Sequence, residues 1–168
     1  MISKQPSQIP PVARSPPSGH YDRPRRVDLT QPSPLARYPE LPLSFKDHEH
    51  HYMLGWPASK DFLEQFFLRC APGITKIYMP GSCRCSVGVR CLRHLSGCDD
   101  CSWAEALPVD APIPQDTQSP NPISTLPILC IAHTGSARTL IRRVTEAQYD
   151  WFVQQFGKEP QWYKDALA

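Results

Sequence analysis

The chain has 168 residues, among them 20 prolines, and 18 Lys or Arg against 16 Asp or Glu give a formal net charge of +2. This length gives room for one domain. No apolar run approaches the roughly 20 residues that span a bilayer, and the polar, proline-broken start is unlike a secretory signal. These features predict an intracellular protein, cytoplasmic or nuclear, that has no membrane partner.

The first part of the chain, residues 1–46, is predicted to be a disordered, proline-rich and basic arm. It holds ten of the prolines and seven Lys or Arg against three Asp or Glu, and it has neither a helical nor a strand period. We interpret the basic run Arg23–Arg26 as solubilising charge. Residues 47–168 are predicted to form a single small α+β domain.

The first predicted helix begins after Ser59, whose side chain can accept a hydrogen bond from a free amide of the first turn. Apolar residues then recur at helical spacing and form one face: Phe62, Leu63, Phe66, Phe67 and Cys70. Pro72 and Gly73 end the helix. The alternating residues 74–79 are predicted to be a strand.

Two loops are predicted in the middle of the domain, a cysteine-rich loop over residues 81–103 and a proline-rich loop over residues 104–125. The apolar run 126–133 and the segment 138–144 are predicted to be the two strands of a β-hairpin that turns near Gly135.

The last predicted helix has a signal at each end. Thr145 and Gln148 match a capping box, and Gly157 stands where the helix ends. Pro160 is expected to start a final short turn. The predicted fold class is therefore α+β, a small antiparallel sheet with helices packed on one face, preceded by a long disordered N-terminal arm.

The C-terminal segment TEAQYDWFVQQFGKEPQWY contains a Thr-capped helix and then Gly157, Glu159, Pro160, Trp162 and Tyr163. In this pattern it resembles the C-terminus of uncharacterised small proteins of mushroom-forming fungi. The resemblance covers 19 of the 168 residues. It implies a source lineage and carries no function.

Five of the seven cysteines and one histidine lie within residues 83–101. Structural zinc needs four tetrahedral Cys or His ligands, usually in two short-spaced pairs. The sequence therefore predicts Zn²⁺ as a structural cofactor. The predicted ligands are Cys83, Cys85, Cys98 and Cys101, with Cys91 and His94 as alternates.

Three other interpretations of these cysteines stay open. In the first the thiols are reduced and unligated, in the second they form disulfides, and in the third Cys98 and Cys101 cycle as a redox pair. Cys70 and Cys130 lie on apolar faces, so we expect both of them in the core.

A candidate nucleic-acid surface is formed by Arg138, Arg142 and Arg143 on the second strand of the predicted hairpin. The alternative is an edge strand whose charges prevent association with another strand. We favour the alternative, because residues 47–168 carry eleven Lys or Arg against thirteen Asp or Glu, whereas nucleic-acid-binding domains are usually basic.

No serine nucleophile, phosphate-binding loop or paired-carboxylate site is recognisable, so the sequence does not favour an enzyme. It predicts a non-catalytic binding or interaction module with an unknown protein partner. The first alternative is a nucleic-acid-associated protein that uses the arginine surface, and the second is a Cys-dependent enzyme.

Overall fold

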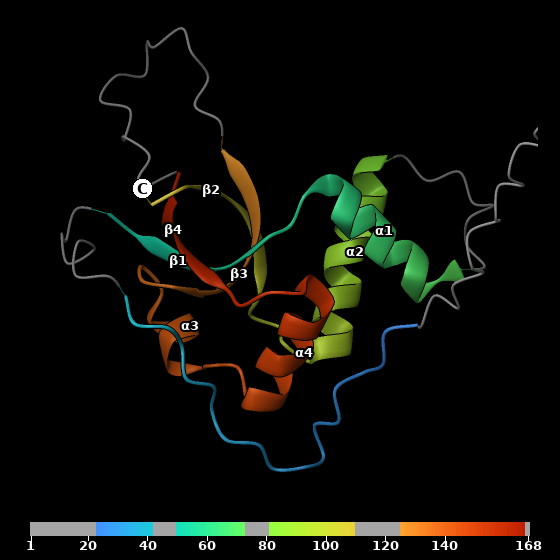
Figure 1. The fold of residues 1–168 in the computed structure, drawn as a ribbon, viewed down its shortest axis with the longest axis horizontal. Helices are drawn as coiled ribbons and strands as arrows, with labels where there is room; N and C mark the ends of the chain where they lie inside the picture. Colours follow the sequence, from blue (N-terminus) through green and yellow to red (C-terminus); the bar gives the residue numbers. More distant parts are fainter. Residues whose placement is uncertain (1–22, 42–49, 73–80, 110–124, 167–168) are drawn as a thin grey trace, which may run out of the picture.

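A computed structural model describes residues 23–41, 50–72, 81–109 and 125–166, and it confirms the predicted α+β class (Figure 1). The elements follow one another in this order: β1 (Tyr52–Pro57), α1 (Lys60–Cys70), α2 (Gly81–Ser96), β2 (Ser102–Leu107), β3 (Leu126–His133), α3 (Ala137–Ile141), α4 (Glu146–Phe156) and β4 (Gln161–Asp165).

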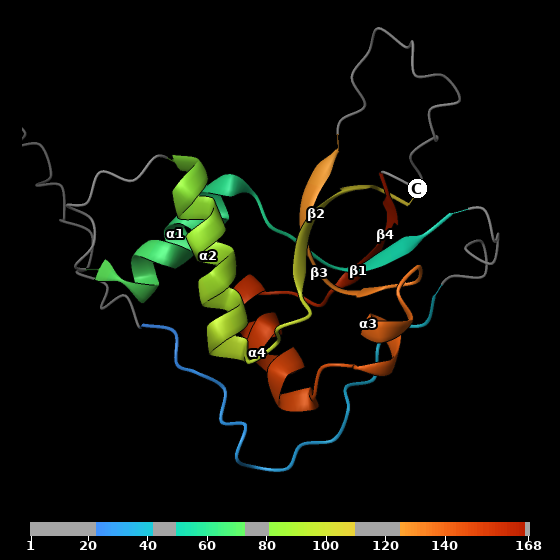
Figure 2. The ribbon, with the colours of Figure 1, turned by 180° about the vertical axis from the view of Figure 1, so that it is seen from behind.

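The four strands form one antiparallel sheet in the order β1-β3-β2-β4, and β4 also pairs with β1, so the sheet closes on itself as a small barrel. Helices α1, α2 and α4 gather on one side of it (Figures 1 and 2). The small antiparallel sheet with helices on one side is therefore confirmed, whereas its closure was not predicted.

Strand β3 is buried on both of its faces. Ile128 and Cys130 belong to a small cluster to which all four strands contribute, and Leu129 and Ile131 belong to the larger core beneath the helices. Because successive side chains of a strand point to opposite faces, the small cluster fills the interior of the closed sheet. Burial on both faces explains why residues 126–133 are a continuous apolar run, and this predicted strand is confirmed.

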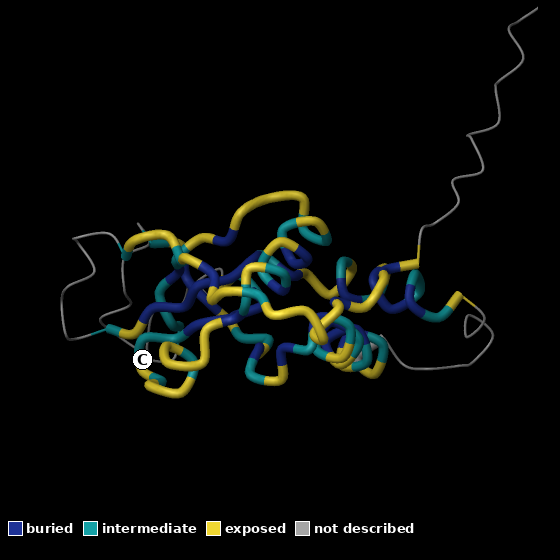
Figure 3. Tube along the Cα trace, turned by 90° about the horizontal axis from the view of Figure 1, so that it is seen from below, coloured by how far each residue is buried: buried dark blue, intermediate teal, exposed yellow. Residues whose placement is uncertain are grey.

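The larger core joins the helices to the outer face of the sheet. Trp56 of β1 is fully buried, and its ring centroid lies 5.3 Å from that of Phe152 in α4 and 5.2 Å from that of Phe156. Figure 3 shows the buried stretches of the chain running through the middle of the domain and the exposed ones around its outside. Cys70 and Cys130 are both buried, as predicted.

The described part of the predicted arm, residues 23–41, is packed against the domain. Its Val27 amide donates to the Leu95 carbonyl at 2.8 Å, and its Ala36 amide donates to the Val144 carbonyl at 2.9 Å. Val27 and Ala36 are themselves buried. The predicted arm of residues 1–46 is therefore wrong over this stretch, and its remainder lies outside the described residues.

Three other predictions are corrected. Residues 81–96 of the predicted cysteine-rich loop form helix α2, and residues 102–107, at the border of the two predicted loops, form strand β2. The predicted second hairpin strand is instead the short helix α3 and a following turn.

The predicted final turn is strand β4, which closes the sheet. Strand β1 was not predicted, and the predicted strand 74–79 lies outside the described residues. Within the described ranges, no helix combines the length and the apolarity that crossing a membrane requires.

Candidate functional site

The structure does not bring the predicted zinc ligands together. Cys83 and Cys85 lie in the first turns of α2, whereas Cys98 and Cys101 follow its last turn. At 1.5 Å of rise per residue, the helix separates the two pairs by about 20 Å. Across the residues that the structure describes, no group of three or more His, Cys, Asp or Glu is placed to hold a metal ion, and Cys91 and His94 complete none. Zinc binding stays a prediction.

Cys98 and Cys101 contact each other between α2 and β2. The Cys101 thiol donates to Cys98 and, together with the backbone amides of Cys101 and Asp100, holds the pKa of Cys98 below its ordinary value. The same bond and burial raise the pKa of Cys101. Both thiols are secluded, since Cys98 is 7% exposed and Cys101 is fully buried.

The three arginines of the predicted nucleic-acid surface do lie together, around a hollow of about 230 Å³ that Cys98 also lines. Arg138 is paired with Asp100 at 2.7 Å, and the Arg143 guanidinium lies 5.3 Å from the centroid of the Tyr38 ring. Asp99 and Asp100 also line the hollow, so three arginines face two aspartates. This surface is therefore nearly balanced in charge.

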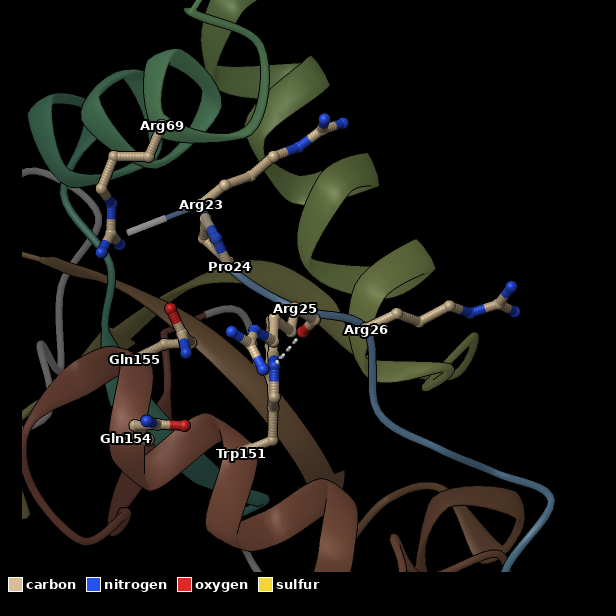
Figure 4. A pocket seen from close by; sticks show the side chains of 8 residues that line it. All are labelled: Arg23, Pro24, Arg25, Arg26, Arg69, Trp151, Gln154 and Gln155. Carbon is tan, nitrogen blue, oxygen red and sulfur yellow. Dashed lines mark hydrogen bonds between the residues drawn. The ribbon is translucent and has the colours of Figure 1, made fainter. Parts of the chain in front are cut away.

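A larger hollow, of about 460 Å³, forms where the segment 23–26 crosses the ends of α1 and α4. We call it the arginine groove. Its lining residues are Arg23, Pro24, Arg25, Arg26, Arg69, Trp151, Gln154 and Gln155. In Figure 4, Arg25 and Arg69 lie on the side of the two glutamines, whereas the side chains of Arg23 and Arg26 extend to the other side of the segment.

Specific contacts hold the walls of the groove in place. The indole N–H of Trp151 donates to the carbonyl of Arg25 at 2.7 Å, which fixes the segment against α4. The Arg69 guanidinium lies 5.2 Å from the centroid of the Phe66 ring, so α1 holds this cation in position. Trp151 is itself anchored, since its ring packs edge-on against Phe66 and Phe152.

The groove is strongly cationic. Four arginines line it and no aspartate or glutamate does. Among the described residues, none of these four guanidinium groups takes part in an ion pair. Arg25 is exposed and Arg69 is half-buried, so both can be reached from solvent. The amides of Gln154 and Gln155 add neutral donors and acceptors to the same hollow.

Sequence reasoning missed this groove because it placed Arg23–Arg26 in a disordered arm. The groove also needs Arg69 and α4, which lie 43 or more positions away along the chain. The one local signal was the density of arginines beside prolines that hold the backbone extended.

In comparisons with known proteins, no protein-family model, curated protein or solved structure matches the chain.

Proposed function

We propose that the protein is a non-catalytic binding module that holds an anionic segment of a partner protein in the arginine groove. The observation that carries this proposal is the lining of the groove, where Arg25 and Arg69 lie on the side of the two glutamines and no aspartate or glutamate is present. Such an excess of one charge in a hollow attracts ligands of the opposite sign and orients them.

The type of cation supports the proposal. A guanidinium group offers donors in a planar fork that fits a carboxylate with two parallel hydrogen bonds. Arg25 and Arg69 come from different segments and flank one hollow, so a single extended acidic segment can contact both. Gln154 and Gln155 can bind the backbone of that segment, because a side-chain amide both donates and accepts.

An acidic protein segment fits the groove better than a nucleic acid does. Single-stranded nucleic acids are usually held by exposed aromatic side chains on which the bases stack. Every described Phe, Trp and Tyr is buried or half-buried, and Trp151 in the groove is only 8% exposed. The groove thus offers charge without a stacking platform.

The test is a fluorescence anisotropy titration of the full chain against a labelled glutamate-rich peptide and a labelled single-stranded RNA. We expect the peptide to bind, and to bind more weakly as ionic strength rises. The double variant Arg25→Gln, Arg69→Gln should bind it roughly 30-fold more weakly, since each lost charge-assisted contact costs about 1 kcal/mol.

The matched control is Arg37→Gln, Arg142→Gln, which removes the same net charge from two exposed arginines outside the groove. It should retain nearly all of the peptide affinity. Equal losses in the two double variants would show non-specific attraction and overturn the proposal. Tighter binding of the RNA than of the peptide would favour a nucleic-acid-associated protein instead.

A further inference from the structure

A second pair of cysteines meets between α1 and α2, next to the arginine groove. Cys70 is the last residue of α1 and Cys91 lies in the middle of α2. Both line an apolar hollow of about 300 Å³, whose other lining residues include Arg23, Arg90 and His94. Cys70 is 8% exposed and Cys91 is half-buried, so the hollow gives solvent a path to Cys91 in particular.

The two thiols are unequal. The Cys70 thiol donates a hydrogen bond to Cys91, and this bond lowers the pKa of Cys91 to about 7 although burial opposes it. The same bond and then burial raise the pKa of Cys70. Cys91 is therefore the thiol of the pair that ionises first. A lowered pKa and partial exposure are conditions in which a cysteine is reactive.

We propose that Cys91 is a peroxide-sensitive thiol that Cys70 resolves, so that oxidation joins α1 to α2 by a disulfide. The side-chain contact between Cys70 and Cys91, in a hollow that both of them line, carries the proposal. It does not depend on what binds in the arginine groove. Cys98 and Cys101 also touch, but both are more secluded from an oxidant.

The chemistry takes two steps with a hydroperoxide as the oxidant. The Cys91 thiolate attacks one peroxide oxygen, so an S–O bond forms, the O–O bond breaks, and the leaving oxygen departs as water after it gains a proton. Cys70 then loses its proton and attacks the Cys91 sulfur, so the S–S bond forms and the S–O bond breaks with release of a second water. Two thiols and one hydrogen peroxide thus yield one disulfide and two waters.

The experiment treats the reduced full chain with an equimolar amount of hydrogen peroxide, blocks the remaining thiols by alkylation and maps the peptides by mass spectrometry. The expected main product is a peptide pair joined through Cys70 and Cys91, lighter by two hydrogens and released by dithiothreitol. In Cys70→Ala, which lacks the resolving thiol, dimedone should trap a sulfenic acid on Cys91.

The matched control is Cys83→Ala, which removes the exposed thiol at the start of α2 and should leave the yield of the disulfide unchanged. Peptide mapping of the unaltered chain needs no variant, so it tests the proposed Cys70–Cys91 disulfide even if Cys70→Ala fails to fold. A first disulfide between Cys98 and Cys101 would overturn the proposal. So would oxidation of Cys83 while Cys70 and Cys91 stay free.

Discussion

At Gly88, α2 lies in close contact with the backbone of α1. A Cβ atom built there would lie 2.4 Å from the backbone oxygen of Leu63 and 3.2 Å from the Leu63 Cβ. The first of these atoms belongs to the backbone of a packed helix and cannot move aside cheaply. Gly88 therefore sets the spacing between the two helices that carry Cys70 and Cys91.

We predict that Gly88→Ala lowers the free energy of unfolding by about 2 kcal/mol, because overpacking a core contact costs 1–3 kcal/mol. In an unhindered helix the same change would stabilise the protein by about 1 kcal/mol, so the sign of the effect reports the close contact. Urea unfolding of the variant and of the unaltered chain measures this difference in the free energy of unfolding. Arg90→Ala, an exposed site on the same helix, is the control and should change stability by less than about 0.5 kcal/mol.

The lowered pKa of Cys91 predicts how the reactivity of this thiol depends on pH. The thiolate is present above about pH 7 and is lost as the pH falls through that value. The rate of alkylation of Cys91 by iodoacetamide should therefore rise with a midpoint near pH 7. The other charged or titratable residues that line the hollow are Arg23, Arg90 and His94, and Arg69 lies near Cys70.

In Cys70→Ala the same midpoint should move to higher pH, because the thiol that stabilises the Cys91 thiolate is gone. Peptide mapping after timed alkylation gives the rate for Cys91 alone. Identical midpoints in the two proteins would show that Cys70 does not hold the charge on Cys91.

Residue-level reasoning from the sequence was misled by the cysteines. Because the cysteines were interpreted as zinc ligands, which are usually held on turns, residues 81–103 were predicted to be a loop. In the structure Cys85, Val89, Leu92 and Ser96 are buried at helical spacing on one face of α2. Cysteine behaves there as a small apolar residue. The helical period was present in the sequence, but it shows only if cysteine is counted as hydrophobic.

Helix α4 is the element whose prediction is confirmed in most detail. The Thr145 side chain accepts from the Gln148 amide at 3.3 Å, and the Gln148 side chain accepts from the Thr145 amide at 2.9 Å. Gly157 ends the helix with a φ of 69°. The side-chain amide of Gln148 also donates to the Ser96 carbonyl at 3.0 Å, so the cap joins α4 to the end of α2.

We predict that Thr145→Ala destabilises the protein by about 1 kcal/mol, the usual cost of losing a capping side chain. Glu146→Ala, the neighbouring exposed position, is the control and should cost clearly less. Thermal unfolding followed by circular dichroism compares the two. A Thr145→Ala variant as stable as the unaltered chain would contradict the role of the cap.

The contrast between α4 and the strands explains how much of the fold could be predicted. A capping box and a terminal glycine are local signals, and they lie within 13 residues of one another. Strands β2 and β4 lie far apart along the chain, and they pair only through Ala106 and Leu107 of β2. Nothing local in residues 161–165 indicates that this segment is the strand that closes the sheet. The segment 138–144 was predicted to be the second strand of a hairpin that turns near Gly135, yet Thr139 instead bonds the His133 backbone at the start of α3.

At the scale of the whole molecule, residues 23–41 contact both the helices and the sheet. The segment runs past α2 and α4, and Leu35 forms a β-bridge with Thr145 (Figures 1 and 2). At its far end, the indole N–H of Trp162 in β4 donates to the Pro39 carbonyl at 3.0 Å. The walls of the arginine groove come from this segment, α1 and α4, so a local pattern could indicate only the part that residues 23–26 contribute.

We predict that a chain that starts at residue 42 is much less stable than one that starts at residue 23. Both lack residues 1–22, so their difference isolates the packed segment, which buries Val27 and Ala36 and satisfies the Trp151 indole. Removing these contacts should cost several kcal/mol and lower the melting temperature by roughly 10 °C or more. Equal melting temperatures would mean that the segment is not part of the fold.

The most direct test of the groove uses the four tryptophans of the chain. Each indole N–H donates to a different carbonyl, those of Lys158, Ala58, Arg25 and Pro39, so NMR of the isotope-labelled full chain gives four separate indole signals. Only Trp151 lines the groove. On titration with the glutamate-rich peptide, binding in the groove predicts a shift of the Trp151 signal while that of Trp103 stays in place. A Trp151 signal that does not move while the peptide binds would contradict the proposed site.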